Sequence, residues 1–247
     1  MANLIDSKNA LKLPIYNKLR NKRVILASSS ERRINLLKSI GINPEVVPST
    51  FKEDLDHETF NEFEEIDLKG IKYSLTNSTE KAIEVYTRLV EESPENAPDL
   101  VIGSDTIIQS YIPKSNQASI ILEKPTSKSD QFKILKDLVT ADEDKIIEVI
   151  TSVTLVFPSL LSPGFKLKHL SEKTRIWFGD LNDEDLLAYI ENGEGIDKAG
   201  GFAIQGIGSQ FIKRIHGDYN NVVGFPIYAF LNLMKSLINE DDEFLSD

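Results

Sequence analysis

The chain has 247 residues, of which 40% are apolar and 27% charged, values that are ordinary for a globular protein with a substantial core. Its net charge of −11 argues against broad nucleic-acid or membrane-binding surfaces, because both need basic patches. The chain has no cysteine, so disulfides, thiolate catalysis and cysteine-held zinc are excluded, and its three histidines show no metal-binding spacing.

The first predicted elements are a strand over residues 24–27 and a helix that follows three serines. Ser30 suits the N-cap of this helix, apolar residues recur at helical spacing, and Gly41 ends it. The free backbone N–H groups of a first helical turn favour an anion, and the guanidiniums of Arg32 and Arg33 suit phosphate oxygens. A capped helix with solvated arginines explains the same residues, so the junction alone leaves both interpretations open.

Strands and helices continue to alternate through the first half of the chain. A short strand at 44–47 leads to an acidic, polar segment at 54–67, which we expect to be a surface loop or a frayed helix start. An amphipathic helix follows, with one apolar stripe from 82 to 90. Residues 100–108 read as a buried strand that is interrupted at its centre.

The second half keeps this alternation. A turn-rich excursion at 111–118 leads into a short strand at 120–122, which is expected to pair back on the preceding strand. The further elements are a helix at 132–139, strands at 146–157 and 174–178, a helix capped by Asn182 or Asp183, and a last helix at 225–237 before a mobile acidic tail. The order predicts an α/β fold with one mixed, twisted sheet flanked by helices, without internal repeats.

Asp105 is the strongest candidate for a catalytic or metal-binding residue. An aspartate in a Val/Ile-rich strand carries a desolvation cost unless it is paired, bound to a metal, or placed at a ligand-binding edge. Ligands of open α/β sheets bind at the strand ends, where a carboxylate can activate water or hold a metal. A turn residue that closes a shorter strand is the alternative reading.

Two lysines stand near predicted apolar elements. Lys81 lies at the edge of the amphipathic helix, and Lys124 directly follows the strand at 120–122. Each alone is expected to be a solvated surface charge. Together with Arg32 and Arg33 they form a phosphate clamp if the fold brings them together.

The segment 193–208 holds six of the chain's 13 glycines. This density favours a loop whose backbone approaches a ligand, although the pattern matches neither the Rossmann nor the P-loop motif. A flexible connector is the alternative. Within the segment, the Gln205 amide can match the N–H and carbonyl edge of uracil or thymine, and a glutamine bonded to its own loop would look the same.

Taken in order, five segments resemble the Maf family of nucleoside triphosphate pyrophosphatases, and the resemblance extends from residue 23 to the last helix. Each segment alone is weak evidence for the family, whereas all five in this order are specific evidence. The segments are LASSSERR at 26–33, GSDT at 103–106, EKP at 123–125, DKAGGFAIQG at 197–206 and GDYNNVVGFP at 217–226.

The resemblance implies hydrolysis of a nucleoside triphosphate between its α- and β-phosphates, giving a monophosphate and pyrophosphate with Mg²⁺ or Mn²⁺. The branch it resembles acts on dTTP and UTP, and modified pyrimidine nucleotides are a further substrate class. It also implies two lobes with a central cleft, and commonly a homodimer.

Residue by residue, the resemblance makes Asp105 the general base, and we expect Asp105 and Glu53 to hold the metal. Arg32, Thr106 and Gln205 match positions linked to base selectivity. The substrate-binding residues expected on this basis are Ser28, Arg32, Arg33, Glu53, Lys81, Thr106, Lys124 and Gln205.

Three residues depart from the family pattern: Glu31 replaces a usual proline, Ser104 an alanine and Phe225 a leucine. Glu31 places a negative charge beside the expected phosphate site. A catalytically weak nucleotide-binding regulator is therefore the alternative function, and a scaffold whose acidic tail recruits a basic partner is a second one.

We expect an N-terminal extension at 1–22, a single two-lobed catalytic domain at 23–238 and an acidic tail at 239–247. The N-terminus has no signal-peptide pattern, and no stretch is apolar enough to span a bilayer. A cytoplasmic protein that binds neither nucleic-acid polymers nor membranes is the expectation, with a nuclear location left open.

Overall fold

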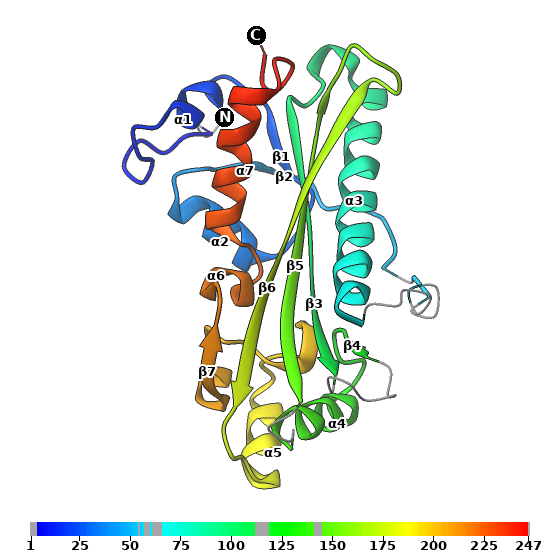
Figure 1. The fold of residues 1–247 in the computed structure, drawn as a ribbon, viewed down its shortest axis with the longest axis vertical. Helices are drawn as coiled ribbons and strands as arrows, with labels where there is room; N and C mark the ends of the chain where they lie inside the picture. The colour runs from blue at the N-terminus through cyan, green and yellow to red at the C-terminus, as the bar shows by residue number, and fades with distance from the viewer. Residues whose placement is uncertain are drawn as a thin grey trace.

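A computed structural model describes residues 4–53, 55–56, 60, 66–111, 119–140 and 145–246. Within these residues, a seven-stranded mixed sheet has the order β2-β1-β3-β5-β6-β7, with β4 paired to β3 beside this path. Its long antiparallel strands are β3 (Leu100–Tyr111), β5 (Ile146–Pro158) and β6 (Phe165–Phe178), which run the length of the molecule (Figure 1). The predicted mixed α/β fold is confirmed.

One edge of β3 is shared by two short strands that do not meet. β1 (Val24–Leu26) pairs parallel with residues 100–102, and β4 (Ile120–Leu122) pairs antiparallel with residues 108–110. Along the described residues, this edge is therefore open from 103 to 107, while β5 pairs with the whole opposite edge. The predicted interruption of the strand is wrong, because β3 is continuous and the break lies between its neighbours.

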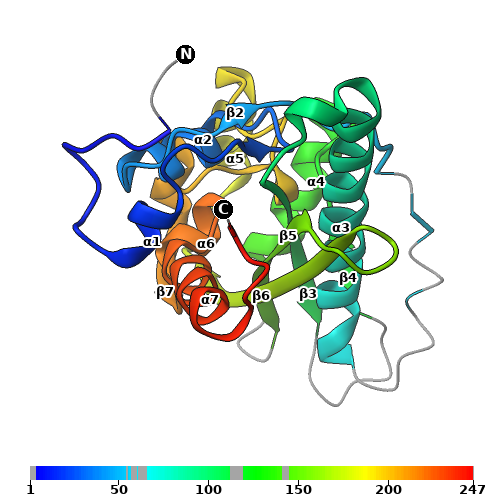
Figure 2. The same ribbon diagram turned by 90° about the horizontal axis from the view of Figure 1, so that it is seen from above.

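The helix α3 (Ile66–Glu92) covers one face of the sheet (Figures 1 and 2). Its C-terminal half packs apolar residues, Ala82 and Val85 among them, onto β1, β3 and β5. Tyr73, in its N-terminal half, packs in a second apolar cluster with Ile107 and Ile150. Buried polar residues lie between these clusters, including Asn77 and Ser78. Because the N-terminal half of α3 lacks an apolar stripe, the sequence pattern predicts only the C-terminal part of the helix.

The other face of the sheet carries the largest core cluster and the helices α2, α6 and α7, with α1 beside α7 (Figure 1). α4 and α5 pack together at one end of the sheet. The bounds of these elements and of the remaining short ones are α1 (Pro14–Lys18), α2 (Glu31–Ser39), β2 (Glu45–Val46), η2 (Pro94–Asn96), α4 (Lys128–Val139), α5 (Asp183–Asn192), η3 (Ala199–Gly201), η4 (Ile207–Phe211), β7 (Ile212–His216), α6 (Tyr219–Val223) and α7 (Ile227–Glu240).

The local signals at element ends are confirmed in part. Asn182 caps α5, since its side chain accepts from the Asp185 N–H at 3.0 Å and the Asp185 side chain accepts from the Asn182 N–H at 3.0 Å. Ser30 occupies the N-cap of α2, but its side chain makes no capping hydrogen bond. Gly41 follows α2 with a φ of 79°, a conformation that favours glycine.

Both ends of the described chain pack on the main core. Ile15 and Leu19 of the expected N-terminal extension are buried in it. Phe244 is buried against Phe157, with ring centroids 5.0 Å apart, and Leu245 is buried beside it. The prediction of a mobile acidic tail is therefore wrong as far as residue 246, because the burial of these two apolar side chains holds the segment on the core.

Most of the acidic segment expected at 54–67, and residues 112–118 of the excursion expected at 111–118, lie outside the described residues. Strand β6 begins earlier than the predicted 174, and β7, α1 and α6 are additional to the predicted elements. Among the helices that the structure describes, none has the length and apolar character needed to cross a membrane.

Candidate active site

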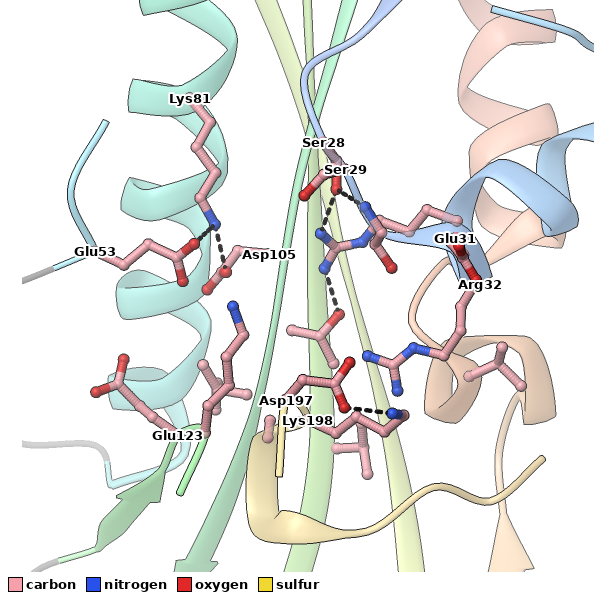
Figure 3. Close-up of a pocket in the computed structure, with 18 of the residues that line it drawn as sticks. Ser28, Ser29, Glu31, Arg32, Glu53, Lys81, Asp105, Glu123, Asp197 and Lys198 are labelled. Atoms are coloured by element: carbon pink, nitrogen blue, oxygen red, sulfur yellow. Dashed lines mark hydrogen bonds and ion pairs between the residues drawn. The ribbon is translucent and has the colours of Figure 1, made fainter. Parts of the chain in front are cut away.

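A cavity of about 740 Å³ lies beside the open stretch of β3 (Figure 3). Its wall is built from the β1–α2 junction, the loop after β2, the centres of α3 and β3, the chain after β4, and the loop before η3. All the predicted site residues except Gln205 line it: Ser28, Arg32, Arg33, Glu53, Lys81, Asp105, Thr106 and Lys124. This volume is within the range of small-molecule sites.

The open edge of β3 explains why side chains from both sheet faces reach one cavity. Successive side chains of a strand point to opposite faces. Asp105 accordingly meets Lys81 of α3, whereas Thr106 meets Arg33 of α2 on the other side. Because neither β1 nor β4 covers this stretch, both residues line the same space.

Lys81 joins two carboxylates at the α3 side of the cavity. Its buried Nζ lies 2.8 Å from Asp105 Oδ1 and 2.9 Å from Glu53 Oε1 (Figure 3). Burial favours the neutral form of Glu53, but the charges of Lys81, Lys124 and Arg33 outweigh it, so the pKa of Glu53 lies below its ordinary value. Glu53 therefore stays ionised at neutral pH.

Arg33 holds several parts of the cavity wall together. Its Nε donates to the Gly224 carbonyl at 3.0 Å, Nη1 to Ser28 Oγ at 3.2 Å and Nη2 to Thr106 Oγ1 at 3.0 Å. Burial lowers the pKa of Arg33, and the charge of Asp105 opposes this change. Three of its five N–H donors bond to protein atoms, so Arg33 links α2 to the segment after β1, to β3 and to the turn after α6.

Arg32 lies on the opposite side of the cavity and faces the segment that carries Asp197 and Lys198 (Figure 3). Burial lowers the pKa of Arg32, and the charge of Asp197 counteracts this. Within the described residues, Arg32 makes no hydrogen bond or ion pair. The whole guanidinium of Arg32 is thus available to bind an anion in the cavity.

Several lining residues have no predicted role. Glu123 lines the cavity beside the exposed Lys124, and its Oε1 accepts a hydrogen bond from the Tyr73 hydroxyl at 2.7 Å. Asp197 and Lys198 also line it and form an ion pair at 2.5 Å. All three lie in the family-like segments 123–125 and 197–206, so the sequence contains a signal for them.

Gln205 is exposed and is not among the residues that line the cavity. The loop next to it is fixed by Glu194, whose carboxylate accepts from the Ile207 N–H at 3.1 Å and the Gly208 N–H at 2.8 Å. The structure therefore does not bring Gln205 to the other candidate residues, and its base-reading role stays a prediction.

The carboxylates suit a metal ion shared with a substrate better than a closed metal site. In the part of the chain that the structure describes, no group of three His, Cys, Asp or Glu residues could hold a metal. Asp105 and Glu53 both contact Lys81 Nζ, so their oxygens lie close together. Mg²⁺ is commonly bound by one or two carboxylates, with substrate phosphates and water completing its octahedron. The donor set fits such an ion.

Comparisons with known proteins point in the same direction as the geometry. The model of the family described as Maf-like protein matches residues 23–237. A Schizosaccharomyces pombe protein named dTTP/UTP pyrophosphatase is 36% identical over 241 residues, which cover 96% of this chain and 92% of that protein. A Homo sapiens protein named probable bifunctional dTTP/UTP pyrophosphatase/methyltransferase is 37% identical over 226 residues, 91% of this chain and 33% of that protein.

The chain thus spans about a third of the human relative's length but nearly all of the yeast one. Among solved structures, a Mycobacterium abscessus nucleoside-triphosphatase, also described as a dITP/XTP pyrophosphatase, matches with 11% identity over 87% of this chain and 97% of that one. Its TM-score is 0.36, too low to support an argument about this chain.

Proposed function

The chain belongs to the Maf family of nucleoside triphosphate pyrophosphatases, and from this premise we propose that it acts on dTTP and UTP, or on modified pyrimidine nucleotides. The reaction breaks the bond between the α- and β-phosphates and gives a nucleoside monophosphate and pyrophosphate. The names of the yeast and human relatives support this choice of substrates.

The observation that carries the proposal is a buried carboxylate set among cations in one cavity. Asp105 is 5% exposed and contacts Lys81, and the cavity beside it is also lined by Arg32 and Lys124. A triphosphate carries about four negative charges at neutral pH, which such cations neutralise in a site of low dielectric. The net charge of −11 on the whole chain makes this local cluster necessary.

Asp105 is the general base in this mechanism. Its Oδ1 is held by Lys81 at 2.8 Å, and its Oδ2 accepts from Asn77 at a longer 3.3 Å, so we assign Oδ2 to receive the proton of the attacking water. The water oxygen bonds to the α-phosphorus, the bond from that phosphorus to the bridging oxygen breaks, and pyrophosphate leaves with the electron pair. Lys81, Arg32 and Lys124 stabilise the charge on the phosphates.

Asp105 and Glu53 are the residues that would hold Mg²⁺ or Mn²⁺, and such an ion supplies further charge neutralisation to the triphosphate when bound. We also propose two lobes around the cavity, and a cytoplasmic homodimer. The family resemblance supports the lobes and the dimer.

The direct test is pyrophosphate release from a panel of nucleotides, UTP, dTTP, CTP and GTP, with Mg²⁺ or Mn²⁺. We expect Asp105→Asn to lower kcat by about 10²–10⁴-fold with the fold intact, because it keeps the shape of the side chain and removes the base. Asp180→Asn is the matched control, since Asp180 is exposed and does not line the cavity. Near-normal turnover by Asp105→Asn would show that the assigned role is wrong.

A nucleotide-binding regulator without useful turnover is the second candidate. Glu31 lines the cavity at the start of α2, where its charge opposes a phosphate. This candidate predicts nucleotide binding without pyrophosphate release, and Glu31→Pro or Glu31→Gln would then raise the turnover.

A further inference from the structure

We propose that Tyr73 and Asn77 of α3 are positioning residues that orient the carboxylates of Glu123 and Asp105 in the cavity. The inference rests on the proposed function, because it assigns these carboxylates to the reaction. It adds two residues that lie outside every motif of the sequence analysis.

Tyr73, Asn77 and Lys81 are spaced four residues apart on α3, so they form one row along the helix. Each meets a carboxylate at the cavity. Tyr73 donates to Glu123 Oε1 at 2.7 Å, and Asn77 Nδ2 donates to Asp105 Oδ2 at 3.3 Å. Lys81 joins Asp105 to Glu53, so one helix face holds three carboxylates from three separate segments (Figure 3).

The two pairs are also linked electrostatically, because the Asn77 side chain lowers the pKa of Tyr73. Burial, together with the bond to Glu123, raises the pKa of Tyr73. The hydroxyl therefore stays protonated over the working pH range and remains a donor to Glu123. Asn77 ties the two carboxylate contacts together.

Packing alone does not explain these two polar side chains. Tyr73 and Asn77 are both 0% exposed, and an apolar residue would fill either place. Asn77 Oδ1 is buried and has no hydrogen-bond partner within the described residues, which is unfavourable for stability. The amide is therefore accounted for by its N–H contact to Asp105.

The two carboxylates need such partners because a carboxylate rotates freely about its terminal torsion. With Oδ1 on Lys81 and Oδ2 on Asn77, the plane of the Asp105 carboxylate is fixed. The Tyr73 hydroxyl fixes one oxygen of Glu123 in the same way. A base that is already held in its reactive orientation does not pay an entropic cost to reach that orientation during the reaction.

The first experiment compares Asn77→Ala with Ser78→Ala by steady-state kinetics of pyrophosphate release. Ser78 is a matched control, since it is also buried on α3 but bonds to Thr154, away from the cavity. We expect Asn77→Ala to lower kcat by about 10–100-fold, the usual effect of removing an orienting partner, with little change in KM. Ser78→Ala should keep both. Equal losses in the two variants would overturn the proposal.

The variant Asn77→Asp supplies a readout that a structural role would not move. A second carboxylate beside Asp105 disfavours the ionised pair, so the acid limb of the kcat–pH profile should move up by about 1–3 pH units. An unmoved acid limb would show that residue 77 does not face the carboxylate that acts in the reaction, and the proposal would be wrong.

The second experiment is a double-mutant cycle between Tyr73→Phe and Glu123→Gln. Tyr73→Phe keeps the buried ring and removes only the hydroxyl, so the variant is expected to fold. We expect a loss in kcat in the wild-type background and no further loss in the Glu123→Gln background. Additive losses would show that Tyr73 does not act through Glu123.

Crystal structures of Tyr73→Phe and Asn77→Ala separate this inference from the proposed function. If the wild-type protein releases no pyrophosphate from any nucleotide, the proposed function fails, while the structures still report on the two carboxylates. New orientations of Glu123 and Asp105 in the respective variants are the expected result. Unchanged orientations in both would overturn the inference.

Discussion

Replacing Gly103 by alanine tests how closely α3 must approach β3 to build the cavity. A Cβ at this position would lie 2.2 Å from the Ser78 carbonyl oxygen and 2.8 Å from Ala82 Cβ, both on α3. These distances are roughly an ångström short of van der Waals contact. The nearest atom is backbone, which no side-chain rotation can move away, so α3 has to shift from the sheet.

Overpacking of this kind costs about 1–3 kcal/mol of unfolding free energy. In a chain of this size, each kcal/mol lowers the melting temperature by about 2–4 °C. The larger effect is expected on turnover, because α3 carries Lys81 and the contact of its Nζ with Asp105 is 2.8 Å long. A displacement near 1 Å in a catalytic arrangement can cost about 10²-fold in rate.

Thermal denaturation and pyrophosphate release from UTP measure the two effects of Gly103→Ala. Gly179→Ala is the matched control, since a Cβ there would have its nearest neighbour, the Phe211 carbonyl oxygen, at 3.9 Å. The control should keep the melting temperature and the turnover. A Gly103→Ala variant with both values unchanged would refute the close approach as the reason for this glycine.

Three further substitutions test other parts of the structure. Burial raises the pKa of Glu84, but hydrogen bonds from Arg88, Ser49 and Thr50 have the larger, opposite effect and bring it down to about 2. The ionised Glu84 therefore stabilises the fold fully above about pH 4.5, and this stabilisation is lost as the pH falls toward 2. Glu84→Gln should therefore lower the free energy of unfolding at pH 7, and its difference from wild type in denaturant titrations should shrink below about pH 4.5. Arg33→Lys cannot reproduce the three bonds of the guanidinium and should cost about 1.5–3 kcal/mol or more, which an unchanged melting temperature would contradict. Gln205→Leu should change the ratios of kcat/KM among UTP, dTTP, CTP and GTP more than it slows the best substrate, and constant ratios would count against base reading by Gln205.

The parts of the site that depend on local sequence were predictable. The strand, the three serines and the two arginines of the β1–α2 junction are adjacent in the chain, so their pattern predicts both the element and its charge. Asp105 is recognisable because an acidic residue among β-branched ones is costly without a partner. The ordered motifs then associate it with Lys124, the family resemblance adds Lys81, and the cavity brings all three together.

The remaining features depend on contacts between distant segments. Gly103, Ser104 and Asp105 resemble a break in a strand, whereas the break belongs to β1 and β4, and pairing partners are not encoded in a strand's own residues. The roles of Asn77 and Tyr73 are likewise not predictable from the local sequence, because their partners lie on β3 and after β4. The same holds for Phe244, whose burial against Phe157 is invisible in an acidic tail.

The open edge of β3 leaves part of the cavity independent of side-chain identity. The Ile102 carbonyl accepts from the Ala27 N–H on this edge, so the alternate residues Ser104 and Thr106 direct their own peptide groups the same way. These donors and acceptors persist under every replacement at the two positions, apart from proline, which removes an N–H. Mutational drift can thus change the side chains at these positions while the backbone N–H and C=O groups of both residues keep offering the same hydrogen-bonding pattern.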